Sequence, residues 1–163
     1  MNNVELSPEY ILNLIENINE NLLKMKKFTD EILICNYDEL EENIYKRDIC
    51  FEKVKENFEI LKKIDTEQSD ELHAVMSDSA EYDSLSEINK KIYDERMKMK
   101  SLAVDIRSRD NLVFEKLSQC RDTMLEKIKE LNSGAEANAS KYYSSSAAAA
   151  SQNVYFPKRN RKI

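Results

Sequence analysis

Apolar residues recur along the first part of the chain at alternating intervals of four and three, the spacing of one face of an α-helix. Seven positions carry this pattern, and only Thr29 among them is not apolar: Ile11, Ile15, Ile18, Leu22, Met25, Thr29 and Ile32. Ser7 stands where an N-cap is expected, and Pro8 follows at the first helical position, where a missing amide hydrogen costs nothing. The pattern therefore predicts an amphipathic helix from Pro8 to about Asn36.

A second pattern of the same kind follows a short polar turn. Asp38, with Glu41 three residues later, has the spacing of a capping box, so a second helix is expected to begin at Asp38. Its inward positions are predicted to be Leu40, Ile44, Arg47, Phe51, Val54, Phe58 and Leu61. Arg47, the charged member, is expected to extend toward solvent or to pair with a carboxylate. Two amphipathic helices of similar length joined by a short turn predict an antiparallel hairpin.

Residues 65–83 are polar and acidic and are predicted to form the main linker of the chain. Within it, the stretch from Ser69 to Met76 has the pattern of one or two helical turns. His73, the single histidine, is expected to be a solvated residue of this linker.

A third helix is predicted from a capping box at Ser84 and Glu87 to Leu131. Its polar stretch 107–111 is the one plausible break, but the heptad phase continues across it, so we expect one continuous helix. The members of the pattern are Leu85, Ile88, Ile92, Met99, Leu102, Ile106, Val113, Cys120, Met124 and Leu131. At about 1.5 Å per residue this helix is longer than either helix of the hairpin, so its C-terminal part is expected to extend past the hairpin.

The composition changes after Leu131 to small and polar residues, with serine and alanine runs at 144–150. Gly134 is predicted to end the third helix as its C-cap. The remaining segment has too little apolar surface to offset its ordering entropy, so it is predicted to be a flexible tail. Three aromatic residues of the tail are candidates for docking, with chance occurrence as the alternative: Tyr142, Tyr155 and Phe156.

These elements predict an all-α protein in which an antiparallel helical hairpin and a long third helix form a three- to four-helix bundle or coiled coil. The bundle is assigned to residues 1–132 and the flexible Ser/Ala-rich tail, with its aromatic and basic end, to residues 133–163. The presence of a single glycine, Gly134, and of only two prolines agrees with this, because sheets and tight hairpins need such residues at their turns.

Composition narrows the classes of function. No stretch has the roughly 18 to 20 consecutive apolar residues of a membrane span, and the chain begins with polar residues, so we expect a cytoplasmic protein without membrane insertion. The net charge of −6 argues against nucleic-acid binding, although five basic residues and one acidic residue follow Gly134. That basic tail is interpreted either as an interaction segment or as a solvated end that aids solubility.

The residues that enzymes use are not visible in recognisable patterns. Cys35, Cys50 and Cys120 are far apart and lie within helical patterns, which favours reduced packing residues over a disulfide or zinc framework. There is no metal-ligand motif, phosphate-binding loop or nucleophile next to a base. The sequence therefore predicts a protein that is not an enzyme, holds no cofactor or metal, and binds another polypeptide.

Apolar side chains of the third helix beyond the reach of the hairpin are the leading candidates for such binding. The candidate client-binding residues are Phe51, Phe58, Val113, Leu117, Met124, Leu125 and Ile128. For Phe51 and Phe58 the alternative interpretation is burial in the hairpin core. Each such side chain gains about 1.5–3 kcal/mol on full burial, so an exposed row of them favours a partner.

The stretch from Asn21 to Leu61 resembles the small flagellar export chaperones of the FliT and FlgN kind. The resemblance rests on the first apolar helix, an acidic break at 38–40, and a second helix with an arginine-centred segment at 44–48. The C-terminal part is similar to members from Gram-positive bacteria, in which a long last helix leads into a small-residue stretch with a tyrosine, here Tyr142, and an aromatic and basic ending. The long polar linker and the alanine run depart from the FliT kind, and the length is closer to the FlgN kind.

The resemblance implies a cytosolic helical bundle that shields the amphipathic C-terminal helix of a filament-cap or hook-associated protein before secretion. It also implies delivery of that client to components of the export apparatus. The alternative hypothesis, from a different class, is a structural or scaffolding coiled coil that self-associates, for example as a homodimer, through the same apolar row.

Overall fold

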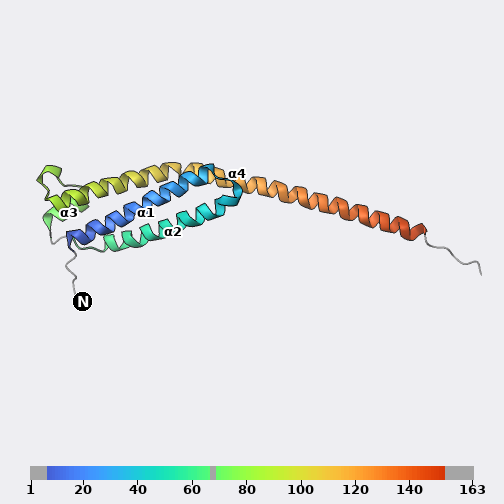
Figure 1. The fold of residues 1–163 in the computed structure, drawn as a ribbon, viewed down its shortest axis with the longest axis horizontal. Coiled ribbons are helices and arrows are strands. Elements are labelled where there is room, and N and C mark those ends of the chain that lie inside the picture. Colours follow the sequence, from blue (N-terminus) through green and yellow to red (C-terminus); the bar gives the residue numbers. More distant parts are fainter. Residues whose placement is uncertain (1–6, 67–68, 153–163) are drawn as a thin grey trace, which may run out of the picture. The chain divides into compact units, whose positions relative to one another are not determined.

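The computed structural model describes residues 7–66 and 69–152, with side chains described as far as Ser146. The helices are α1 (Pro8–Ile34), α2 (Tyr37–Lys62), α3 (Asp70–Met76) and α4 (Glu87–Gln152), and a 3-10 turn, η1, spans Tyr82–Ser84 (Figure 1). No strand occurs in the described part of the chain. The predicted all-α fold class is therefore confirmed. The chain divides into two compact units between Leu117 and Ser118, and each is described by itself below.

Helix α1 begins as its sequence predicts. Ser7 is the N-cap, its Oγ accepts a hydrogen bond from the amide of Tyr10 at 3.3 Å, and Pro8 opens the helix. All seven residues of the predicted apolar pattern are buried, including Thr29, whose Oγ1 donates to the carbonyl of Met25. The capping residues and the continuous pattern together explain why this helix could be predicted in full.

The N-terminal unit is a bundle of α1, α2 and the first half of α4 (Figure 1). Helices α1 and α2 form the predicted antiparallel hairpin, and α4 runs in the direction of α1. The Lys26–Asp105 and Asp30–Arg109 ion pairs, at 2.8 and 3.1 Å, join α1 to α4. Helix α3 covers the end of the bundle where α1 begins, because its Leu72 and Val75 belong to the same core as the α1 residues.

The structure corrects two expectations for α2. Its N-cap is Asn36 rather than Asp38, and that cap makes no side-chain hydrogen bond. The helix is also rotated relative to the predicted inward face. Leu40 and Leu61 are buried as expected, but the intervening buried positions are Asn43 and Cys50. Ile44 is half-buried, and Phe51 and Phe58 are exposed by 47% and 38%.

Helix α4 differs from its prediction at both ends. It begins at Glu87, and Ser84 belongs to the preceding 3-10 turn, so the predicted capping box at Ser84 is wrong. The helix is continuous across 107–111, as expected. It does not end at Gly134 but continues to Gln152, and Gly134 does not have a positive φ. A single exposed glycine costs a helix only about 1 kcal/mol, and good helix formers such as Ala135 and Ala137 follow it.

Replacing Gly134 with alanine is expected to stabilise the C-terminal part of α4 by about 1 kcal/mol. A Cβ at this position would meet nothing within 4 Å, and the backbone is helical. Amide exchange of residues 130–138 should slow in Gly134→Ala and accelerate in the matched control Ala135→Gly. Faster exchange in Gly134→Ala would contradict a continuous helix and would restore the predicted C-cap.

Candidate interaction surfaces

The first candidate surface lies on the outer edge of α2 and follows from the rotation of that helix. Arg47 attaches α2 to the other two long helices, because its Nε donates to Thr29 Oγ1 at 2.9 Å and its terminal nitrogen binds Asp110 at 2.8 Å. The side chain thus joins all three long helices of the bundle. Its pairing with Asp110 is the carboxylate pairing that the sequence predicted as one of two alternatives. With Asn43 and Cys50 inward, Phe51 and Phe58 remain at the surface. Both are therefore candidates for partner contact rather than hairpin core.

The candidate residues of α4 are not all exposed. Val113 is 7% exposed and belongs to the buried residues of the N-terminal unit, and Leu117 is half-buried. Val113 cannot bind a client without opening of the bundle, so its assignment as a surface residue is wrong for this structure. Lys116 explains why α4 stays packed this far, since its Nζ donates to the carbonyl of Cys35 at the hairpin turn.

The second candidate surface is the α4 segment in the C-terminal unit. From residue 121 to 146, no side chain is buried. Met124 and Leu125 are 48% exposed, Ile128 is 52% exposed and Leu131 is 73% exposed. Met124, Ile128 and Leu131 are spaced by four and three, so they share one face of the helix, and Leu125 flanks that face. We call these four residues the α4 row.

The aromatic candidates of the predicted tail are placed only in part. Tyr142 is exposed on α4 and makes an edge-to-face contact with Tyr143. The two ring centres are 6.0 Å apart, within the range of about 4.5–7 Å that is typical of such pairs. Tyr155 and Phe156 lie outside the described residues. Tyr143, which also stands out in the small-residue composition of this segment, is as exposed as its neighbour and would be available to the same partner.

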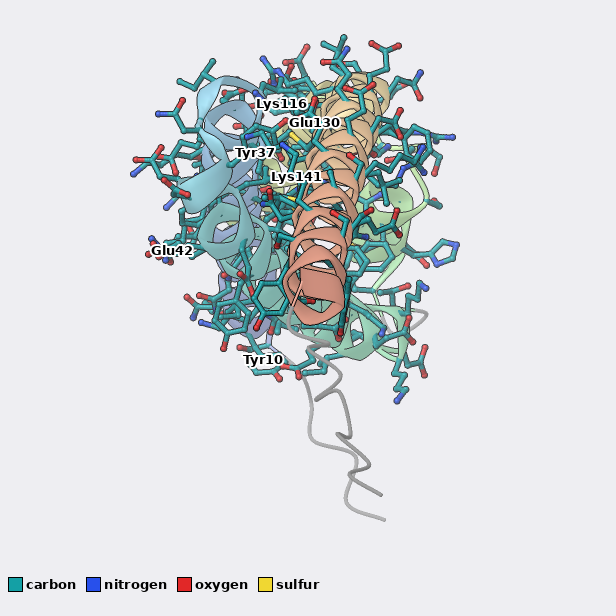
Figure 2. All side chains as sticks on the ribbon, turned by 90° about the vertical axis from the view of Figure 1, so that its right-hand side faces the viewer. Tyr10, Tyr37, Glu42, Lys116, Glu130 and Lys141 are labelled. Atoms are coloured by element: carbon teal, nitrogen blue, oxygen red, sulfur yellow. The ribbon has the colours of Figure 1, made fainter. Side chains whose placement is uncertain are left out.

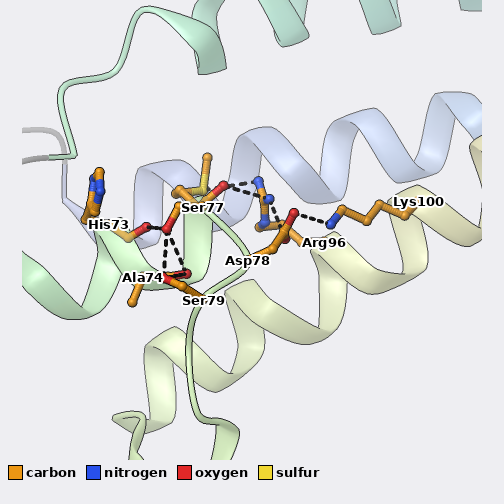
Figure 3. Close-up of polar contacts among 8 residues, drawn as sticks. His73, Ala74, Ser77, Asp78, Ser79, Arg96 and Lys100 are labelled. Atoms are coloured by element: carbon orange, nitrogen blue, oxygen red, sulfur yellow. Dashed lines mark hydrogen bonds and ion pairs between the residues drawn. The ribbon is translucent and has the colours of Figure 1, made fainter.

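A polar cluster attaches the end of α3 to α4 (Figure 3). Arg96, buried on α4, donates from one terminal nitrogen to the carbonyl of Met76 and to Asp78, each at 2.9 Å. Lys100 binds the other oxygen of Asp78 at 2.5 Å. Asp78 has a φ of 63°, a left-handed conformation in which aspartate is tolerated, and it follows the C-cap residue Ser77. The cluster therefore fixes both the turn after α3 and its position on α4.

A second polar contact holds the start of α3. Glu71 accepts hydrogen bonds from the backbone amide and the hydroxyl of Ser86 and from Asn89 Nδ2. The Ser86 amide, followed by Asn89, lowers the pKa of Glu71 below its usual value. At the other end of α3, hydrogen bonds from Lys100 and then Arg96 lower the pKa of Asp78. Both carboxylates are therefore held in their charged form.

No group of three or more His, Cys, Asp or Glu side chains in the described part of the chain is arranged to hold a metal ion. The three cysteines have free thiols, with Cys50 and Cys120 buried. Among the helices described, none combines the length and the apolar character needed to cross a membrane.

The architecture defines a class: a small helical-bundle protein that carries apolar side chains on exposed helix faces. Comparison of the chain with family models, curated proteins and solved structures finds no match. The exposed apolar surfaces and the resemblance carried by residues 21–61 are therefore the features that bear on function.

Proposed function

We propose that the protein is a cytosolic export chaperone that binds the amphipathic C-terminal helix of a flagellar filament-cap or hook-associated protein. The observation that carries the proposal is the α4 row, four large apolar side chains about half exposed or more on a regular helix. An amphipathic helix matches such a row, because its own apolar residues repeat at the same spacing of three and four. Delivery to export-apparatus components is part of the same proposal.

The size of the α4 row suits a partner that must be released. Full burial of a large apolar side chain is worth about 1.5–3 kcal/mol, and these four are already partly covered, so closing the row contributes on the order of 3–6 kcal/mol. Association itself costs several kcal/mol. The balance predicts weak, reversible binding. The charged residues that flank the row are Arg121, Lys127, Lys129 and one carboxylate, Asp122, whereas Glu126 and Glu130 lie on the opposite face of the helix with Ser133 and Ala137.

The proposal is tested with fluorescently labelled peptides of the C-terminal helices of flagellar cap and hook-associated proteins from the same cell. The double variant Met124→Asp with Ile128→Asp is expected to weaken binding at least about tenfold, since each aspartate would lose its water on contact. Ser133→Asp with Ala137→Asp, on the opposite face of α4, adds the same charge and is the control. Equal binding by the two double variants, or no binding of any such peptide by the unaltered chain, would exclude this function.

The self-associating scaffold is distinguished in the same samples. If the α4 row serves self-association, Met124→Asp with Ile128→Asp should convert an oligomer into a monomer in sedimentation, and no flagellar peptide should bind. That result would favour the scaffold over the chaperone.

A further inference from the structure

Two parallel rows of side chains run along the outer edge of α2. The first row is apolar, with members seven residues apart: Ile44, Phe51 and Phe58. The second row is charged and exposed, with the same spacing: Glu41, Asp48, Lys55 and Lys62. Residues three and four apart are neighbours on a helix surface, so each apolar residue lies between two members of the charged row.

The charged row is acidic in the first half of α2 and basic in the second half. Reversing the direction of α2 about a point next to Phe51 therefore places Glu41 opposite Lys62 and Asp48 opposite Lys55. The same reversal places Phe51 within one residue of its own counterpart, about 1.5 Å along the helix axis, and places Ile44 equally close to Phe58. A surface that matches its own reverse in both apolar character and charge is what a two-fold symmetric interface requires.

We propose that this edge of α2 binds a second copy of the chain, in an antiparallel dimer with a two-fold axis near Phe51. Phe51 packs against Phe51 of the partner subunit. Glu41 pairs with Lys62 of the partner subunit, and Asp48 pairs with Lys55 of the partner subunit, so that four intermolecular ion pairs border the apolar contact. The antiparallel direction also opposes the dipoles of the two helices favourably.

The residues involved are available for this contact. Phe51 and Phe58 are 47% and 38% exposed. Lys55 and Lys62 are paired within α2 to Glu52 and Glu59, at 3.5 and 3.0 Å, but these pairs are exposed and can exchange for intermolecular ones. Lys62 also lies 5.0 Å from the centre of the Phe58 ring, so it already stands at the border of the apolar row. Figure 2 shows Glu42, the next residue of α2 after Glu41, with its side chain directed away from the bundle.

A second copy is favoured over a foreign helix because the apolar and charged rows of α2 are complementary to the same rows of another copy in the reverse direction. From Glu41 to Lys62 the row is about 30 Å long at 1.5 Å per residue, which gives a small interface. Small interfaces dissociate readily, so the dimer is expected to form and dissociate within about 1 to 200 µM. This surface is separate from the α4 row, and the dimer does not depend on the proposed chaperone function.

The test uses the full chain and two charge-reversal variants in sedimentation velocity across that concentration range. Glu41→Lys with Asp48→Lys makes the charged row wholly basic, and Lys55→Glu with Lys62→Glu makes it wholly acidic. Each variant alone is expected to dimerise at least about tenfold more weakly than the unaltered chain, since like charges then face each other. An equimolar mixture of the two variants is expected to regain the dimer as a 1:1 complex.

Two controls keep the result specific. Glu16→Lys with Glu20→Lys changes the charge of exposed α1 residues by the same amount and should leave the dimer intact. Phe51→Ser should weaken the dimer without loss of helix content, because Phe51 contributes little to the core. A chain that is monomeric at 200 µM, variants that dimerise like the unaltered chain, or a dimer lost only on substitution of the α4 row would each overturn the proposal.

Discussion

Ile18→Asp is expected to unfold the N-terminal unit at room temperature, whereas Ile128→Asp should leave its thermal unfolding unchanged. Ile18 is 1% exposed in the core formed by α1, α2 and α4, so an aspartate there must either lose its hydration or take up a proton at a cost in free energy. Substitutions that bury an unpaired charge commonly cost more than about 4 kcal/mol, a large part of the 5–15 kcal/mol of a typical domain. Ile128 is half exposed, so an aspartate there remains in water.

Circular dichroism at 222 nm with thermal unfolding separates the two variants. Ile18→Ala is a useful intermediate, because it removes apolar contact without adding charge and should lower stability by about 2–5 kcal/mol. If Ile128→Asp lowered the melting temperature as much as Ile18→Asp does, the α4 row would belong to a core and could not be a free binding surface.

Arg96→Met is expected to release α3 from the bundle while α1 and α2 keep their protection from amide exchange. The substitution keeps an apolar stem but leaves the Met76 carbonyl and one side of Asp78 without their donor. Removing one partner of a buried ion pair commonly costs about 3–5 kcal/mol. We expect a smaller loss of about 1–3 kcal/mol, since the Asp78 side chain is 45% exposed and can regain water. Faster exchange at residues 70–76, with no change at 11–32, would show this local release.

Acid should release α3 by the same route. The pKa values of Glu71 and Asp78 are lowered in the folded chain, so their stabilising contacts are complete above the unfolded-state pKa and disappear as the pH falls through the folded values. Exchange at residues 70–76, corrected for its intrinsic rate, should therefore accelerate below about pH 4. In Asp78→Asn with Glu71→Gln, α3 should already be loosened at neutral pH and should respond less to acid. An identical acid response in this variant would show that other groups hold α3.

The fold could be predicted from the sequence where one helix carries all of the information. Helix α1 has its cap, its proline and an unbroken apolar pattern, and each of its predicted inward residues is buried. The face of α2 could not be chosen in this way. Positions 40, 47, 54 and 61 belong to two possible inward faces, and the more apolar one includes Phe51 and Phe58. The bundle uses the other face, on which Asn43 and Cys50 are buried. Arg47, which belongs to both faces, contacts Thr29 and Asp110 on two different helices.

The start of α4 and the exposure of Val113 likewise could not be predicted from neighbouring residues in the sequence, because both depend on tertiary contacts. Ser84 has a capping pattern, yet α4 begins two residues after Leu85, where Ser86 contacts Glu71 from α3. Val113 was expected at the surface because the point at which α4 leaves the hairpin depends on tertiary contacts such as Lys116 with Cys35. The α4 row from Met124 onward follows from the apolar pattern alone, and those residues are exposed as predicted.

The direction of α4 beside α1 also has a consequence for the order in which the chain acquires its structure. Helices α1 and α2 meet through residues close in sequence, whereas α4 reaches α1 across long separations, as in the contact of Asn19 with Glu95. Contacts between distant residues form more slowly, because a longer loop must close first. During synthesis at about 5–20 residues per second, the hairpin therefore leaves the ribosome with the α1 face around Asn19 uncovered for several seconds. In that interval the nascent hairpin exposes an apolar surface long enough to bind one helix, and this surface is covered once α4 packs against α1.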